Sequence, residues 1–120
     1  MKTRLQLKSE ASQDSRLDQA IENAKKISSD SETIEITAIN EVLNFLLHEE
    51  WEKITGTEKQ IEFAKKLYNE YFDRYIKNCK EYEDRGKTNR PAYQTMKNAI
   101  EVVSNTYEAA KIINALNDRL

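Results

Sequence analysis

The chain has 120 residues and a net charge of −2, and it contains one Cys, one His, one Pro and two Gly. This length is typical of a single domain, which we expect over residues 1–120, and the net charge lacks the basic bias of a dedicated DNA-binding protein. One Cys excludes an intramolecular disulfide, one Cys with one His excludes the common zinc patterns, and the few Gly and Pro exclude turn-rich all-β folds, so we expect a mainly α protein without metal or other cofactor.

The first third of the chain predicts one short helix between two segments that have the period of a strand. Apolar residues at helical spacing predict a helix over 15–27, with Asp14 or Ser15 as its N-cap. Residues 3–7 and 33–37 alternate apolar and polar side chains, which is typical of strands, and they would pair as a short two-stranded β element. The alternative is a flexible segment over 1–12 and a helix that begins at residue 32.

Two further helices are expected over residues 38–54 and 57–84, because both segments carry apolar residues at helical spacing. Thr57 and Gln60 fit a capping box at the start of the second of these helices. Gly56 and Gly86 mark its two ends, since glycine readily takes the left-handed conformation beyond a helix. At 1.5 Å per residue this helix would be roughly 40 Å long, which is long for a compact chain of this size.

The last predicted helix covers residues 91–118, with Pro91 in its first turn, where the missing N–H costs nothing. Its apolar residues form two stripes offset by more than a quarter turn. Met96 and Val103 lie on the first stripe, and Ala109 and Ile112 lie on the second. A helix that is apolar around so much of its circumference lies at the centre of a bundle or contacts a second chain. We therefore expect an elongated bundle of four helices that forms a homodimer.

Charge is distributed unevenly along the chain. Residues 28–52 contain seven acidic residues and no Lys or Arg, whereas residues 53–90 contain ten basic and seven acidic residues. Glu49, Glu50 and Glu52, which we name the acidic belt, are predicted to bind a partner protein, because an acidic segment can imitate nucleic acid and meet a basic surface. The alternative is a solvated acidic helix face.

Three basic residues crowd the loop before the last predicted helix: Arg85, Lys87 and Arg90, which we name the basic loop. The free N–H groups of a helix start add a partial positive charge, so this loop is predicted to hold a phosphate, a nucleotide or a nucleic-acid backbone. Tyr82 and Tyr93 flank the loop and can stack on a base. A plain solvated turn is the alternative, since acidic residues interrupt the basic ones.

His48 and Cys79 are the only residues of their types, and a Cys with a His can form a nucleophile pair. However, Cys79 falls in the apolar stripe of the helix predicted over 57–84, where a thiol usually acts as a small buried hydrophobe. His48 lies at the edge of its stripe, which favours a surface histidine. We therefore expect no catalytic residue and no metal site, and we do not expect an enzyme.

The sequence also bears on localisation. No apolar run approaches the ~20 residues needed to span a bilayer, and the start of the chain lacks the apolar core of a signal peptide. We expect a cytoplasmic protein without membrane association.

Residues 51–66 read WEKITGTEKQIEFAKK. In this segment an aromatic residue precedes Gly-Thr-Glu-Lys-Gln-Ile and an aromatic-Ala pair, which together open a long helix. The pattern resembles a segment of small, mostly uncharacterised phage and plasmid proteins, and the resemblance extends over residues 49–117. It implies a mobile genetic element as the context of this chain, where small proteins act as regulators or as antagonists of host defence.

These observations favour a small non-enzymatic binding protein that inhibits a host defence protein or sequesters a ligand in the host cytoplasm. The acidic belt and the basic loop are its predicted recognition residues. The alternative is a nucleic-acid-binding accessory or regulatory protein, which would use the basic loop together with Arg74, Lys77 and Lys80.

Overall fold

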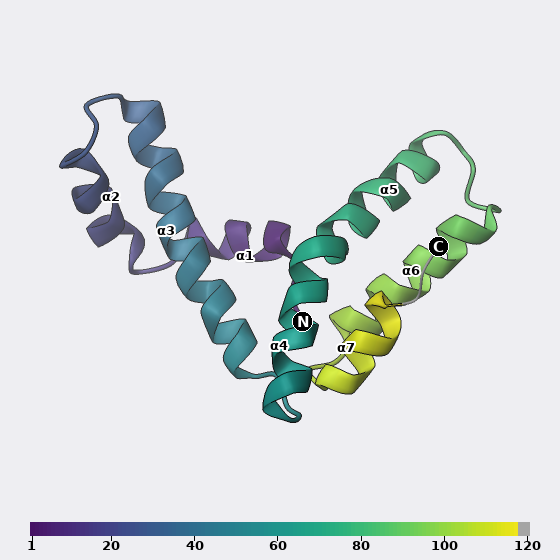
Figure 1. Ribbon diagram of the computed structural model, residues 1–120. Helices are drawn as coiled ribbons and strands as arrows, with labels where there is room; N and C mark the ends of the chain where they lie inside the picture. Colours follow the sequence, from purple (N-terminus) through teal and green to yellow (C-terminus); the bar gives the residue numbers. More distant parts are fainter. Residues whose placement is uncertain (118–120) are drawn as a thin grey trace. The chain divides into compact units, whose positions relative to one another are not determined.

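A computed structural model describes residues 1–117 of the chain (Figure 1). Every regular element in this range is a helix, which confirms the mainly α prediction. The chain divides into two compact units, one formed by residues 2–52 and the other by Met1 together with the residues from Lys53 onward. The single cooperative domain, the elongated shape and the homodimer stay predictions.

The unit of residues 2–52 contains α1 (Arg4–Ala11), α2 (Leu17–Lys25) and α3 (Ser31–Glu52). Both short helices pack on α3, and α2 runs beside it as a hairpin (Figure 1). Alanines at the contacts allow the helix backbones to approach closely, and larger apolar side chains cover their edges. The buried residues are Ala11, Ala20, Ala38 and Val42, with Leu17, Ile21, Ile39 and Leu46 packed against them.

The strand predicted over residues 3–7 is wrong, because this segment belongs to helix α1. Thr3 caps the helix: its hydroxyl accepts from the Gln6 N–H at 3.1 Å, and the Gln6 side chain accepts from the Thr3 N–H at 2.8 Å. Such a reciprocal capping box satisfies two backbone donors at a helix start. Apolar and polar residues alternate over only five residues here, and this weak strand signal does not overcome the helix start that the capping box provides.

The strand predicted over residues 33–37 is also wrong, since α3 begins at Ser31, seven residues before the predicted start at 38. The alternative of a helix that begins at residue 32 is confirmed to within one residue. The Asp30 carboxylate accepts from the backbone N–H and the hydroxyl of Thr33, at 2.9 and 2.6 Å, and so caps the helix. Ala38 and Val42, four residues apart, are buried along one face, whereas Ile36 is 56% exposed. Helical spacing therefore decides which apolar residues are covered.

The helix predicted over residues 57–84 is present as three consecutive parts: α4 (Glu58–Leu67), the π-helical turn η1 (Tyr68–Phe72) and α5 (Asp73–Asp84). The predicted capping box is formed, with 3.2 Å from the Gln60 N–H to the Thr57 hydroxyl and 3.0 Å from the Thr57 N–H to the Gln60 side chain. Sequence periodicity did not reveal the π turn.

The single helix predicted over residues 91–118 is wrong. The structure has α6 (Pro91–Ser104) and α7 (Ala109–Leu116), and residue 118 lies outside the described residues. At the break, Thr55 donates its N–H to the Tyr107 carbonyl and accepts from the Ala109 N–H, both at 2.8 Å, and the Thr106 hydroxyl accepts from the Glu108 N–H at 3.1 Å. The amino group of Met1 also donates to carbonyl oxygens of the break, those of Val103 and Thr106, at 2.5 and 2.9 Å.

The unit that contains α4 to α7 is built on pairwise helix packing. α4 packs on α7, α5 packs on α6, and α6 packs on α7. Each large apolar side chain buried there contributes roughly 1.5–3 kcal/mol to folding. The fully enclosed ones are Met1, Tyr68, Phe72, Val103, Ile112 and Leu116. Residues 1–117 thus contain six continuous helical segments, against the four predicted.

Candidate anion-binding site

Helices α5 and α6 form a hairpin whose connecting loop carries the basic loop residues. Helix α5 ends in a Schellman motif: the Lys87 N–H bonds to the Tyr82 carbonyl at 2.9 Å, and the Gly86 N–H bonds to the Glu83 carbonyl at 3.1 Å. Gly86 has φ +66°, a left-handed conformation that favours glycine. The predicted end of the helix is therefore confirmed, and it fixes where Arg85 and Lys87 leave the helix.

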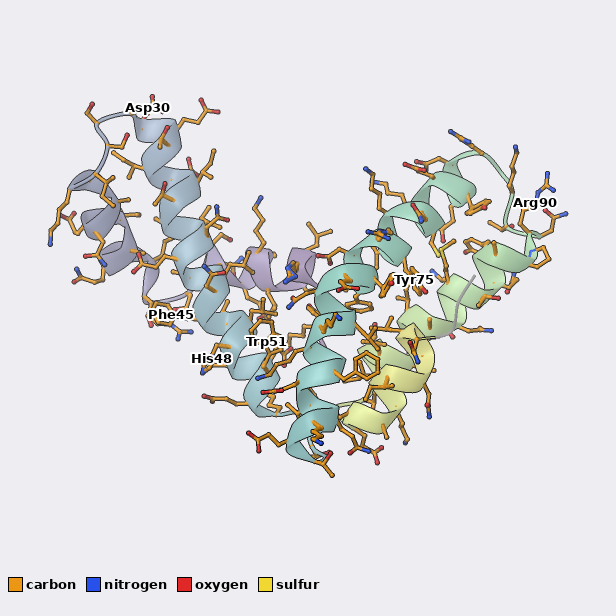
Figure 2. All side chains as sticks on the ribbon, viewed as in Figure 1. Asp30, Phe45, His48, Trp51, Tyr75 and Arg90 are labelled. Atoms are coloured by element: carbon orange, nitrogen blue, oxygen red, sulfur yellow. The ribbon has the colours of Figure 1, made fainter. Side chains whose placement is uncertain are left out.

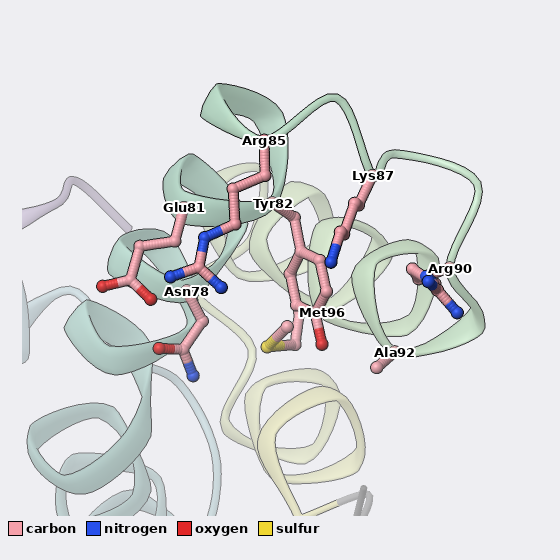
Figure 3. Close-up of a pocket in the computed structure, with 8 residues that line it drawn as sticks. All are labelled: Asn78, Glu81, Tyr82, Arg85, Lys87, Arg90, Ala92 and Met96. Carbon is pink, nitrogen blue, oxygen red and sulfur yellow. The ribbon is translucent and has the colours of Figure 1, made fainter.

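A pocket of about 640 Å³ lies between these two helices and their loop. This volume is within the range of small-molecule sites in proteins. Figure 3 shows Arg85 and Lys87 on either side of the Tyr82 ring, with Arg90 beyond Lys87. The pocket is lined by Asn78, Glu81, Tyr82, Arg85, Lys87, Arg90, Ala92 and Met96. The structure thus brings all three residues of the basic loop to one cavity.

The charges of the basic loop are not neutralised by the described part of the chain. Among residues 1–117, none of the three forms an ion pair, and neither does Glu81 at the pocket edge. All three basic residues are exposed. Together with Glu81 they give the pocket lining a formal charge of +2.

Helix α6 adds to this positive potential. Arg90 is its N-cap residue in an extended conformation, no side chain caps it, and Pro91 occupies the first turn. The unsatisfied N–H groups of a helix start and the aligned peptide dipoles favour an anion. Figure 2 shows Arg90 at this end of the hairpin.

Tyr93 is not available to stack on a base, contrary to prediction. It is 8% exposed, and its hydroxyl donates to the Glu83 carboxylate at 2.7 Å. Glu83 also lies 3.5 Å from the Lys97 ammonium. The bond to Glu83 raises the pKa of Tyr93 to about 12, and the bond from Tyr93 lowers the pKa of Glu83. This bridge joins α5 to α6 beside the pocket.

Tyr82 is the aromatic residue that the pocket does present. Its ring forms an edge-to-face pair with Tyr93, with 6.2 Å between centroids and 70° between planes. A pair of this geometry covers at most one face of the Tyr82 ring. The side chain is half-buried, so its position is held while part of the ring stays accessible.

Four pocket residues were missed by sequence reasoning: Asn78, Glu81, Ala92 and Met96. A signal for the first was present, since Asn78, Tyr82 and Arg85 follow the spacing i, i+4, i+7 of one helix face. Met96 comes from the predicted apolar stripe of α6, and nothing in that stripe distinguishes a pocket floor from an ordinary core residue.

The acidic belt does not form one surface. Glu50 is 2% exposed and accepts from the Lys2 N–H at 3.1 Å. Glu49 binds Arg16 at 2.6 Å, and Glu52 lies 3.1 Å from the His48 ring. Glu49 and Glu50 are consecutive in the helix, so their side chains point about 100° apart, and Glu50 is the one that faces inward. Glu49 and Glu52 remain on the exposed face of α3.

The other candidate residues show no catalytic arrangement of their own. Cys79 is buried, and burial raises the pKa of its thiol, which disfavours the reactive thiolate. His48 is exposed on α3, as the sequence predicted. Within residues 1–117, no three His, Cys, Asp or Glu side chains are placed to hold a metal ion. No helix in that range is long and apolar enough to cross a membrane.

Comparisons with protein-family models, with curated proteins and with solved structures found no match to this chain. Its functional assignment therefore depends on the pocket and its chemistry.

Proposed function

We propose that this protein is a non-enzymatic binding protein that holds a phosphate-bearing ligand in the pocket between α5 and α6. The observation that carries the proposal is the convergence on one pocket of three cations, Arg85, Lys87 and Arg90, that have no ion-pair partner among residues 1–117. Guanidinium groups suit phosphate because they donate two parallel hydrogen bonds to its oxygens. The start of α6 supplies further donors.

The resemblance to phage and plasmid proteins gives this activity a context. A protein of a mobile element that binds a phosphorylated ligand without converting it would lower the ligand's free concentration in the host cytoplasm. Sequestration of this kind needs affinity and abundance, and it needs no catalytic group. The raised pKa of the buried Cys79 thiol is in keeping with this proposal.

The experiment is titration calorimetry with inorganic pyrophosphate at low salt. We expect binding by the natural protein and at least a tenfold loss in the variant Arg85→Ala/Lys87→Ala/Arg90→Ala. The control is Lys77→Ala/Lys80→Ala, which removes two positive charges from the adjoining helix α5 at residues that do not line the pocket. Absence of pyrophosphate binding by the natural protein, or an equal loss in both variants, would overturn the proposal.

A second candidate function is protein binding through α3. Phe45 is 50% exposed, and Glu49 and Glu52 follow it at i+4 and i+7, so the three residues share one face. Figure 2 shows Phe45 and His48 on this helix. Aromatic residues are enriched at protein–protein interfaces, and carboxylates beside such a ring would attract a basic partner. Once a partner protein is identified, the charge reversal Glu49→Lys/Glu52→Lys should abolish its binding. The control Glu32→Lys/Glu35→Lys, on the same helix, should not.

A further inference from the structure

The pocket between α5 and α6 is lined by the charged residues of the basic loop and also by an apolar group, Tyr82, Met96 and Ala92. This combination bears on the class of ligand. We infer that the ligand is a nucleoside di- or triphosphate, whose base lies against Tyr82 and whose phosphates bind the basic loop. This inference depends on the proposed function and makes it more specific.

Tyr82 provides the surface for a base. One face of its ring at most is covered by Tyr93, and its remaining surface lines the pocket beside Met96 and Ala92. Stacking of a base on an aromatic side chain is favourable for every base, because each has a π face. A thioether such as that of Met96 adapts its shape to a flat ring. Inorganic phosphate would leave this apolar part of the pocket unused.

Asn78 and Glu81 provide hydrogen-bonding groups one turn or less from Tyr82 on the same helix. The Asn78 amide can both donate to and accept from the edge of a base. The Glu81 carboxylate can only accept, which suits amino groups of a base or hydroxyls of a ribose. A carboxylate in an otherwise basic pocket disfavours a bare phosphate and suits a ligand that carries donors as well as negative charge.

The charge arrangement favours a mononucleotide over a nucleic-acid strand. Lys77 and Lys80 lie roughly 100° and 160° around α5 from Asn78, so they do not extend the pocket into a basic track. Arg74 is placed over the Tyr71 ring, at 5.5 Å from its centroid. Positive charge is therefore concentrated at the loop, where it matches two or three linked phosphates.

The test compares ADP, GDP, adenosine and pyrophosphate by titration calorimetry with the natural protein. We expect ADP or GDP to bind about tenfold more tightly than pyrophosphate, since stacking of a base on one aromatic ring is worth roughly 5- to 150-fold in affinity. Adenosine alone should bind weakly, because it lacks the phosphates. This comparison needs no variant and so does not depend on any variant folding.

Variants at Tyr82 locate the base. Tyr82→Leu should reduce ADP affinity to that of pyrophosphate and leave pyrophosphate affinity unchanged, whereas Tyr82→Phe, which keeps the ring, should retain the ADP affinity. If pyrophosphate binds and neither ADP nor GDP binds more tightly, the nucleotide assignment is wrong and the phosphate-binding function stands. If neither pyrophosphate nor nucleotide binds, both are wrong. Tighter binding of a single-stranded oligonucleotide than of ADP or GDP in the same titration would assign the pocket to a polymer instead.

Discussion

The Tyr93 hydroxyl of α6 donates a hydrogen bond of 2.7 Å to the Glu83 carboxylate of α5, and this bond joins the two walls of the candidate site. The bond requires a neutral phenol and an ionised carboxyl group. Accordingly, the pKa of Tyr93 is raised to about 12 and that of Glu83 is lowered. The bridge is thus intact across the neutral range.

The contribution of this bridge to stability should depend on pH at both ends of the scale. Because the folded-state pKa of Glu83 is lowered, its contribution is present above the ordinary value of 4.5 and is lost as the pH falls below it. Because the folded-state pKa of Tyr93 is raised, its contribution is present below 10 and is lost as the pH rises toward 12. Urea unfolding across pH 3–11 measures both changes, and Tyr93→Phe should flatten the alkaline one.

Asp14 should make the unit of residues 2–52 sensitive to acid. Its carboxylate accepts from the Arg16 side chain through both oxygens, each at 2.9 Å, and this pairing lowers the pKa of Asp14 from 3.8 to about 2. A lowered pKa means that the stabilisation is present above pH 3.8 and is lost as the pH falls toward 2. The Asp14→Asn variant should be less stable than the natural protein at pH 7, and it should lose less stability between pH 4 and pH 2. Unfolding followed by circular dichroism measures both differences.

The two capping boxes offer a matched test of cooperativity. Thr3→Ala and Thr57→Ala remove the same hydroxyl acceptor from helix starts in different units, and each should cost about 1 kcal/mol. Thr3→Ser and Thr57→Ser keep the acceptor and serve as controls. If the chain unfolds as the single domain that the sequence predicts, both alanine variants lower the same urea midpoint. Two transitions, each shifted by only one variant, would contradict that prediction.

The two glycines should differ in their tolerance of a side chain. Gly56 has φ +145°, and an added Cβ would lie 2.9 Å from Gln60 Oε1 and 3.1 Å from Ala109 Cβ. Gly86 has φ +66° and no atom within 4 Å of an added Cβ. Gly86→Ala should therefore cost about 1 kcal/mol for the left-handed backbone alone. Gly56→Ala should lower the free energy of unfolding by more, because the added Cβ meets close contacts in addition to the backbone strain. Chemical denaturation measures both losses, and an equal loss at the two positions would contradict this account.

The sequence predicted those parts of the fold whose determinants are local. Thr57, Gln60 and Gly86 lie within one turn of the helix ends that they define, so the segment 57–84 was predicted closely. The basic loop was predicted for the same reason, because Arg85, Lys87 and Arg90 lie within six residues of each other.

The break between α6 and α7 depends only in part on local contacts, such as the bond from the Glu108 N–H to the Thr106 hydroxyl at 3.1 Å. It also involves Thr55, which is more than fifty residues away, and the amino group of Met1. One trace of it was present in the sequence. Met96 and Val103 lie on the first apolar stripe and Ala109 and Ile112 on the second, and this offset is the expected mark of two helices that bury different faces.

The acidic belt shows the converse difficulty. A run of acidic residues in a sequence shows where charge lies along the chain but not toward which side of the helix each side chain points. The burial of Glu50 depends on the segments that pack around α3. Its partner, the Lys2 N–H, is forty-eight residues away in sequence. Candidate sites inferred from charge alone therefore need the helix phase before individual residues can be assigned to a surface.

The π turn η1 bears on which changes in chain length this protein can accept. A π turn contains about one residue more than an α turn for the same rotation, so it takes up an extra residue without turning the flanking helices. Deletion of the exposed Glu70 should convert it to an ordinary α turn and leave Asn78, Tyr82 and Arg85 facing α6. A one-residue deletion within α5, between Asp73 and Asn78, would rotate that face by about 100°. Variation in length within this long helix should therefore be confined to residues 68–72.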